Sequence, residues 1–261
     1  MKKIWKSNIT GEILFLLGVI LLWQILYMIG VDGLGIWKAY AMPSPIGVWN
    51  SFTEMIKQGT LLSAIGNSLL RGAIGYILSL MIGGVIGVFM NHFSFLHKNL
   101  RPLIMGIQTL PSICWVPFSI LWCGLTQTAI SFVVIMGSAF SMAIAVDNAI
   151  LNVPPIYKKA ALTMGADQKQ IYWKVIFPAS LPELISGMKQ GWSFAWRALM
   201  SGEVMTTSIG LGQTLMTGRN LADINQVMLV MVVIVVVGIV IDQVIFHNLE
   251  KRILRKRGLT I

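Results

Sequence analysis

Long apolar stretches separated by short polar segments make up most of this chain. An α-helix rises 1.5 Å per residue, so about 20 apolar residues cross the hydrocarbon core of a membrane. Six stretches approach or exceed this length: Ile13–Gly30, Leu61–Met90, Leu103–Trp122, Thr128–Val146, Leu184–Met205 and Val227–Phe246. The pattern therefore predicts an all-α fold, a polytopic membrane bundle of about six transmembrane helices.

Composition supports the membrane assignment. The chain is 56% hydrophobic and 11% charged, whereas soluble domains average roughly 45–50% apolar and about 25% charged residues. We expect one membrane domain over 1–261. Its parts are an N-terminal span with an external segment (1–60), the core spans (61–247), a cytoplasmic loop within them (148–182) and a basic tail (248–261).

The positions of the basic residues predict the orientation. Cytoplasmic loops carry an excess of Lys and Arg. With the N-terminus inside, 14 of the 20 basic residues fall in cytoplasmic segments, and only Lys38, Lys57 and Arg219 fall outside. The cytoplasmic set comprises Lys2, Lys3, Lys6, Lys98, Arg101, Lys158, Lys159, Lys169, Lys174, Lys251, Arg252, Arg255, Lys256 and Arg257. Both termini are predicted to be cytoplasmic, and the net charge of +10 reflects this bias and contact with anionic lipid, not nucleic-acid binding.

Proline and small residues mark special helices. Pro102, Pro111 and Pro117 punctuate the third expected span, so a straight helix is not expected there. Small residues recur at every fourth position in the second and fifth spans, which lets helix backbones approach closely. These residues are Gly75, Ser79, Gly83 and Gly87 in the second span, and Gly187, Gly191 and Ala195 in the fifth.

The segment 148–182 is too long for a simple connection between helices. We expect a helix over Ile156–Met164, ended by Gly165 as a left-handed cap. Asp167, with Gln170 three residues later, starts a second helix in capping-box register, and Pro178 and Pro182 are expected to close it. The predicted helix–turn–helix protrudes into the cytoplasm and is suited to docking a partner.

This segment resembles the cytoplasmic signature of ABC importer permeases, Glu-Ala-Ala, three residues, Gly, nine residues, Ile, one residue, Leu-Pro. The residues that match at the family spacing are Ala160, Ala161, Gly165 and Pro178. Val175 and Phe177 are apolar substitutions, whereas Lys159 replaces the family's acidic residue with a basic one. That departure puts the salt bridge of the usual glutamate in doubt, but not the helix–turn–helix shape.

Further segments resemble the nitrate, sulfonate and taurine-type permeases. They lie before and at the start of the second span, in the third span, and after the fifth. The segments are Met42–Pro45, Ser68–Arg71, Leu110–Ser112, Trp115–Pro117, Leu121–Gly124 and Gly210–Gly212. The resemblance covers nearly everything beyond residue 40.

The resemblance implies a mechanism and partners. Two permease chains, here expected to be identical, would form the pathway for a solute delivered by an external binding protein. Two ATPase subunits would bind ATP and Mg²⁺ and move the docked loops, with Ala160, Ala161 and Gly165 carrying the coupling. No Gly-x-x-x-x-Gly-Lys-Ser/Thr phosphate loop occurs in this chain, so we expect neither an enzyme nor a cofactor of its own. Small anions such as alkanesulfonates, taurine or nitrate are the expected solutes, with a thiamine precursor or other heterocycle as the alternative.

Charges within the spans are candidates for the pathway, because each costs roughly 2.5–3.5 kcal/mol at a helix centre. Arg197 lies midway along the fifth span near Trp196. It is expected either to attract an anionic substrate or to form an ion pair, with Glu203 or the other protomer as partner. Trp115 and Pro117, in the third span, complete the candidate set.

The other ionisable residues carry no assigned function. Arg71 and Lys189 are expected to reach water, and Asp242 to pair with the basic tail. His92 and His97 share a short turn, but no ligand cluster accompanies them, so no metal site is predicted. A secondary transporter would need repeated halves or coupling-ion residues, and a channel would leave the cytoplasmic helix–turn–helix unexplained.

Overall fold

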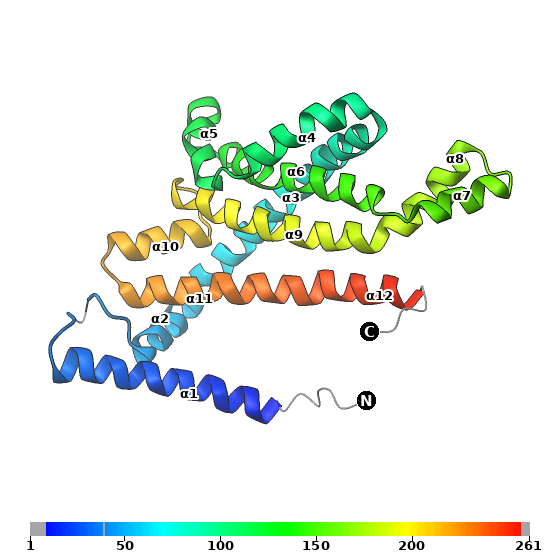
Figure 1. The fold of residues 1–261 in the computed structure, drawn as a ribbon. Helices are drawn as coiled ribbons and strands as arrows, with labels where there is room; N and C mark the ends of the chain where they lie inside the picture. Colours follow the sequence, from blue (N-terminus) through cyan, green and yellow to red (C-terminus); the bar gives the residue numbers. More distant parts are fainter. Residues whose placement is uncertain (1–8, 39, 257–261) are drawn as a thin grey trace. The chain divides into compact units, whose positions relative to one another are not determined.

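The structure is a computed structural model that describes residues 9–38 and 40–256. Every element in that part of the chain is helical, as predicted (Figure 1). Two compact units divide it: one contains the described residues of Met1–Ser63 with Thr214–Val233, and the other contains Ala64–Gln213 with the described residues of Ile234–Ile261. The expected cytoplasmic residues Lys2, Lys3, Lys6 and Arg257 lie outside the described residues.

In the first unit, α1 (Ile9–Tyr27) continues as a π-helical turn (Met28–Gly33), and α2 covers Pro45–Lys57. Ser44 caps α2, because its hydroxyl accepts a hydrogen bond from the Gly47 amide at 2.9 Å and Pro45 occupies the first turn. The Ser44 amide donates to Asn225 Oδ1 at 3.0 Å. The Pro-Ser-Pro stretch therefore sets the start of a helix.

The remaining helices follow in order along the chain. They are α3 (Thr60–His92), α4 (Ser94–Gln108), a 3₁₀ turn (Ser112–Trp115), α5 (Val116–Cys123), α6 (Gln127–Leu151), α7 (Pro155–Thr163), α8 (Gln168–Gln170), a π-helical segment (Ile171–Ile176), α9 (Phe177–Val204), α10 (Leu211–Asn220), α11 (Ile224–Ile241), a second π-helical segment (Asp242–His247) and α12 (Asn248–Lys256).

Within the described residues, four helices are long and apolar enough to cross a membrane: Leu14–Gly33, Thr60–His92, Gln127–Leu151 and Ile224–Ile253. A fifth span is formed if Ser94–Gln108 and Ser112–Cys123, bent by 98° at their junction, count as one. The 28-residue helix α9 is as long as a span but carries four charged residues, and it does not pass the same test. The count of six transmembrane helices therefore stays a prediction, and it depends on whether α9 crosses the membrane.

The third expected span is broken, as its prolines predicted. Pro102 is accommodated inside α4, whereas Pro111 precedes the 3₁₀ turn and Pro117 occupies the first turn of α5, where no amide donor is needed. The break falls at Thr109–Pro111, and the two halves point in different directions (Figure 1).

Packing in the second unit centres on α6, which lies along α9. The small residues make this possible. A Cβ at Gly187 would collide with Ala145, and one at Gly83 would collide with the backbone of Ala139. The glycine stripes of the second and fifth spans thus serve helix packing, as predicted.

Candidate functional site

The turn after α7 has the geometry that its glycine predicted. Gly165 has φ +79°, the left-handed region that glycine adopts without steric cost. Its amide donates to Leu162 O at 3.0 Å, and the Ala166 amide donates to Ala161 O at 3.0 Å. This pair of hydrogen bonds is a Schellman motif, which satisfies the last carbonyls of α7 and turns the chain sharply.

Asp167 then starts the second helix as a capping box. Its carboxylate accepts from the Gln170 amide at 2.7 Å, and the Gln170 side chain accepts from the Asp167 amide at 3.3 Å. The four residues 164–167 thus reverse the chain between α7 and α8. The predicted cap is confirmed.

The prediction that Pro178 and Pro182 close the second helix is wrong. Helical structure continues from Gln168 through a π-helical segment into α9, which ends only at Val204. Pro178 lies in the first turn of α9, directly after the wider π-helical turns, where its missing amide and its ring are tolerated. The second helix of the loop therefore continues into α9 without a break (Figure 1).

Most residues expected to couple to an ATPase lie on the surface of the loop. Lys159, Ala160 and Gly165 are exposed, whereas Ala161 is buried. Val175, Phe177 and Pro178 lie on the following helix, where Phe177 is 43% exposed. The structure thus brings the first four residues to one protruding element, with Asp167 capping α8 beside them. Val175 lies in the π-helical segment, and Phe177 and Pro178 lie in the first turn of α9.

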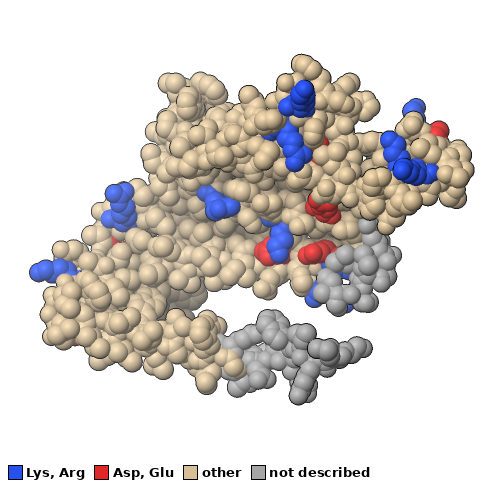
Figure 2. Space-filling view, in the orientation of Figure 1, with Lys and Arg blue, Asp and Glu red and all other residues tan. Residues whose placement is uncertain are grey.

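Apolar side chains on α7 and its turn are also uncovered. Ile156 is 63% exposed and Met164 is 87% exposed, although both lie outside the apolar spans. Lys and Arg side chains gather over the same end of the unit (Figure 2). A short helix with exposed apolar side chains and basic neighbours is suited to an interface with another protein.

A second candidate site lies at the break between α4 and α5. Residues from the break, from α6 and from α9 enclose a cavity of about 310 Å³. Its lining includes Gln108, Ser112, Trp115, Phe140 and Arg197. Of the expected pathway residues, Trp115 and Arg197 are therefore brought together.

Among the described residues, Arg197 is the only charged one that lines this cavity. Its Nε donates to Ser193 O at 3.1 Å, and its guanidinium carbon lies 4.7 Å from the centroid of the Phe194 ring. No carboxylate among the described residues lies within ion-pair distance of it. The cavity consequently carries an uncompensated positive charge.

Glu203 belongs to a different, buried cluster. It pairs with Arg71 Nη1 at 3.2 Å and accepts hydrogen bonds from the Ser68 hydroxyl and, at 3.0 Å, from the Gly212 amide. Arg71 also donates to Ile209 O at 2.8 Å. The expected ion pair between Arg197 and Glu203 is therefore wrong within the chain. The expectation that Arg71 reaches water is also wrong, because the side chains of Arg71 and Glu203 are 8% and 0% exposed.

The remaining candidates lie away from the cavity. Trp196 is buried and donates from its indole nitrogen to Ile234 O at 3.2 Å, and Pro117 lies outside the lining. Asp242 pairs with Lys189 at 3.0 Å, not with the basic tail as expected. The contact that sequence reasoning missed is the pairing of Arg71 and Ser68 with Glu203. The signal was present, because opposite charges inside spans have to be paired.

His97, in the first turn of α4, belongs to a side-chain cluster with Asp147 of α6. His97 Nδ1 lies 3.3 Å from Asp147 Oδ1, and Arg101 pairs with the other oxygen of that carboxylate. Arg101 also donates to Asn148 Oδ1 at 2.8 Å. Among the described residues, no group of three or more His, Cys, Asp or Glu is placed to hold a metal ion. The cluster ties the start of α4 to the end of α6.

Known proteins resemble this chain over most of its length. The putative aliphatic sulfonates transport permease protein of Bacillus subtilis is 28% identical over 240 residues, 92% of this chain and 85% of that protein. A bicarbonate transport system permease protein of Synechocystis is 24% identical over 258 residues, covering 93% and 89%. A nitrate import permease protein from the same genus is 22% identical over 178 residues, covering 68% and 65%.

A solved structure and a family model point to the same class of protein. An inward-facing structure of the MetNI methionine ABC transporter superposes with a TM-score of 0.62 at 22% identity, covering 77% of this chain and 97% of that one. The family described as binding-protein-dependent transport system inner membrane component matches residues 75–255. The chain therefore belongs to this family and is an ABC importer permease.

Proposed function

We propose that this permease carries a small anionic solute through a pathway that includes the cavity at the α4–α5 break. The observation that carries the proposal is Arg197, a cation that faces a cavity and has no ion pair among the described residues. An unpaired charge within a membrane helix marks a substrate pathway. The solute is an alkanesulfonate, taurine or a nitrate-like anion. The relatives named for aliphatic sulfonates, nitrate and bicarbonate are all named for small anions.

Neutral polar groups beside Arg197 can complete anion recognition. Gln108, Thr109 and Ser112 line the same cavity, and Ser112 Oγ lies 3.4 Å from Ser201 Oγ. Amide and hydroxyl groups can donate hydrogen bonds to an anion, and they add no negative charge that would repel it. A thiamine precursor or other heterocycle, the alternative solute, need not carry the anionic group that Arg197 attracts. The positive charge of the cavity is therefore a reason to expect an anion, and it gives no comparable reason to expect a neutral heterocycle.

Uptake and assembly of the complete transporter test this role separately. Arg197→Gln removes the charge, whereas Arg197→Lys keeps it, and Arg219→Gln is a matched control on an exposed residue. We expect Arg197→Gln to reduce uptake of taurine, methanesulfonate or nitrate at least tenfold with assembly intact, and Arg197→Lys to retain part of it. Loss of assembly in Arg197→Gln, or unchanged uptake of the transported anion, contradicts a substrate role.

A separate ATPase drives this permease through the loop between α6 and α9. The support is the protruding α7, its exposed apolar side chains and the unbroken helix from α8 into α9. Two ATPase copies, which hold ATP and Mg²⁺, dock on two identical permease chains, and an external binding protein delivers the solute. The loop and both termini face the cytoplasm, because the basic residues concentrate there.

Co-purification tests the coupling role. Proline at position 165 cannot adopt φ +79°, and it lacks the amide that donates to Leu162 O. Gly165→Pro should therefore release the ATPase from the purified complex. A proline elsewhere, such as Gly66→Pro, cannot serve as the control because it would break α3. Lys174→Gln, an exposed substitution beyond the turn, is the control. An ATPase that stays bound to Gly165→Pro contradicts docking through this turn.

A further inference from the structure

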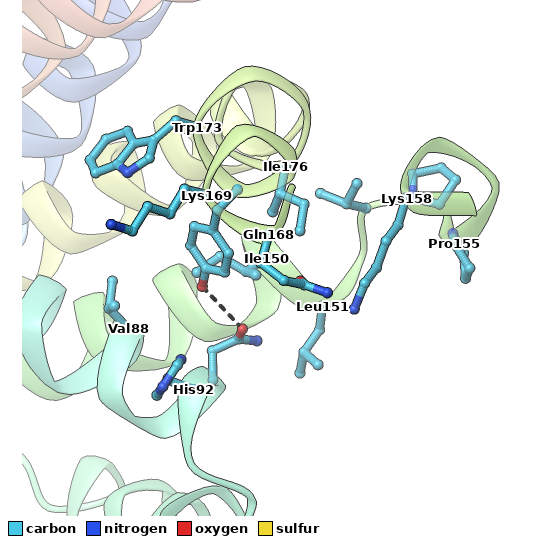
Figure 3. A pocket seen from close by; sticks show the side chains of 14 residues that line it. Val88, His92, Ile150, Leu151, Pro155, Lys158, Gln168, Lys169, Trp173 and Ile176 are labelled. Atoms are coloured by element: carbon cyan, nitrogen blue, oxygen red, sulfur yellow. Dashed lines mark hydrogen bonds between the residues drawn. The ribbon is translucent and has the colours of Figure 1, made fainter. Parts of the chain in front are cut away.

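A cationic pocket lies beneath the loop, where α7, α8 and the π-helical segment Ile171–Ile176 face the ends of α3 and α6. Its volume is about 750 Å³. Lys158 and Lys169 approach it from opposite sides of the view in Figure 3, with His92 below them. No carboxylate is among its described lining residues, and neither lysine forms an ion pair with a described residue.

The neutral groups in this pocket leave its positive charge uncompensated. Tyr172 donates its hydroxyl to Asn91 Oδ1 at 3.4 Å. Burial raises the pKa of the Tyr172 phenol, so this side chain stays neutral at physiological pH. Gln168 and Asn91 add amide groups that can donate to an anion.

An apolar groove of about 400 Å³ continues from the pocket along α3, α6 and α9. Five residues line both spaces: Val88, Ile150, Tyr172, Trp173 and Ile176. The groove extends to Leu80 on α3 and Met188 on α9. Residues 176–188 of a helix extend about 18 Å, close to the roughly 15 Å depth of one leaflet in a core about 30 Å thick.

We propose that the joined spaces bind one anionic phospholipid, with its headgroup between Lys158 and Lys169 and an acyl chain in the groove. Charge complementarity selects the headgroup, because each Lys or Arg near a membrane surface favours anionic lipid. Trp173, which is 69% exposed where the two spaces meet, has the amphipathic ring that prefers the membrane interface. The bound lipid would bridge α7 and α8 to α3 and so stiffen the element that docks the ATPase.

Other occupants fit the two spaces less well. A water-soluble partner can reach the lysines, but it cannot fill an apolar groove that lies along membrane helices. A second copy whose two-fold axis passed through the mouth of this pocket would place identical cationic groups against each other. A molecule with an anionic head and an apolar tail satisfies both spaces.

Native mass spectrometry of the full chain in a neutral maltoside detergent tests the proposal. The chain is titrated with palmitoyl-oleoyl phosphatidylglycerol, with phosphatidylcholine of the same chains, and with glycerol 3-phosphate. We expect one phosphatidylglycerol site with about tenfold higher affinity than phosphatidylcholine. Glycerol 3-phosphate, which has the anionic group without the chains, is expected to bind far more weakly.

Two pairs of variants divide headgroup from chain recognition. Lys158→Gln with Lys169→Gln should lower phosphatidylglycerol affinity about tenfold, to the level of phosphatidylcholine. Lys98→Gln with Lys174→Gln changes the net charge equally at exposed positions outside the pocket and should leave binding unchanged. Gly84→Leu fills the groove, because a side chain there meets open space, and should weaken both lipids; Gly66→Leu, also open, is its control outside the groove.

Three results would overturn the proposal. Equal affinity for the two lipids excludes an anionic site, and equal affinity for glycerol 3-phosphate shows a free phosphate site without chain recognition. If Gly84→Leu weakens assembly with the ATPase or with a second copy while lipid binding is unchanged, a protein covers the groove. None of these outcomes depends on Arg197 or on the identity of the solute, so the proposed transport function is tested separately.

Discussion

Arg71 and Glu203 form a buried ion pair at 3.2 Å, although they lie 132 positions apart in the chain. The pair joins α3 to the end of α9, and it is completed by the Ser68 hydroxyl, which accepts from the Leu211 amide at 2.8 Å. Glu203 also accepts from Gly212, so the start of α10 is held by the same carboxylate. One ion pair thus fixes three helices at this end of the second unit.

Breaking this pair from one side should destabilise the protein strongly. Arg71→Met leaves a buried carboxylate without its cation, and the loss of one partner of a buried pair costs about 3–5 kcal/mol. We expect a large fall in the thermal unfolding temperature of the detergent-purified chain. The double variant Arg71→Met with Glu203→Gln should recover part of the loss, because neither charge is then left alone.

Arg219→Gln, on the exposed surface of α10, is the matched control for charge removal and should change stability little. Equal unfolding temperatures for Arg71→Met and Arg219→Gln would show that the ion pair does not hold these helices. A double variant less stable than Arg71→Met would show that the two side chains do not act as a pair.

The left-handed turn at Gly165 makes a second prediction. Any L-residue at φ +79° is strained by roughly 1–2 kcal/mol, and asparagine tolerates this region better than alanine does. Gly165→Ala should weaken ATPase association up to about tenfold, and Gly165→Asn should weaken it less. Pull-down of the ATPase at graded concentrations measures both.

Gly66→Ala is the control, because Gly66 is helical, a Cβ there meets open space, and alanine favours a helix. Its ATPase association should match that of the unmodified chain. The expected order is therefore Gly66→Ala, Gly165→Asn, Gly165→Ala, from strongest to weakest. Any other order argues against strain at the turn as the cause.

Local features of the chain were predictable, and contacts between distant residues were not. Gly165 and the Asp167 capping box depend on a few neighbouring residues, so the sequence contains all that determines them. The bend near Pro111 follows equally from one residue type. Pro178 was misread because a π-helical segment precedes it, and the sequence shows no sign of that wider turn.

The ion pairs show the same division. Three cations and two acids fall within the spans, and electrostatics requires that the acids be paired. Which cation takes which acid depends on how α3, α9 and α11 pack. Glu203 takes Arg71 and Asp242 takes Lys189, so Arg197 is the cation left to face a cavity. Only the three-dimensional fold makes that assignment.

Lys159 departs from the family's acidic residue, which leads to a third prediction. Its side chain is exposed and forms no ion pair with a described residue. Lys159→Glu should therefore change the stability of the isolated chain by less than about 0.5 kcal/mol. It should weaken association with the cognate ATPase, because the docking surface of that partner has to complement a cation.

The salt dependence of association separates charge from shape at this position. Raising ionic strength should weaken the unmodified complex more than the Lys159→Glu complex. Lys174→Glu, exposed but beyond the turn, is the control and should associate normally. Unchanged association of Lys159→Glu at low salt would show that Lys159 does not face a charged group on the ATPase.

The membrane orientation makes the last prediction, and it also decides whether α9 is a span. Single cysteines replace exposed basic residues in a chain whose own Cys114 and Cys123 are changed to serine. A membrane-impermeant maleimide should label Lys57→Cys and Arg219→Cys in intact cells, since both are predicted to lie outside. Lys158→Cys and Lys251→Cys should react only after the cells are opened. With α9 as a span, Lys158 and Arg219 lie on opposite sides; if both positions label from the same side, α9 does not cross the membrane and the six-span prediction fails.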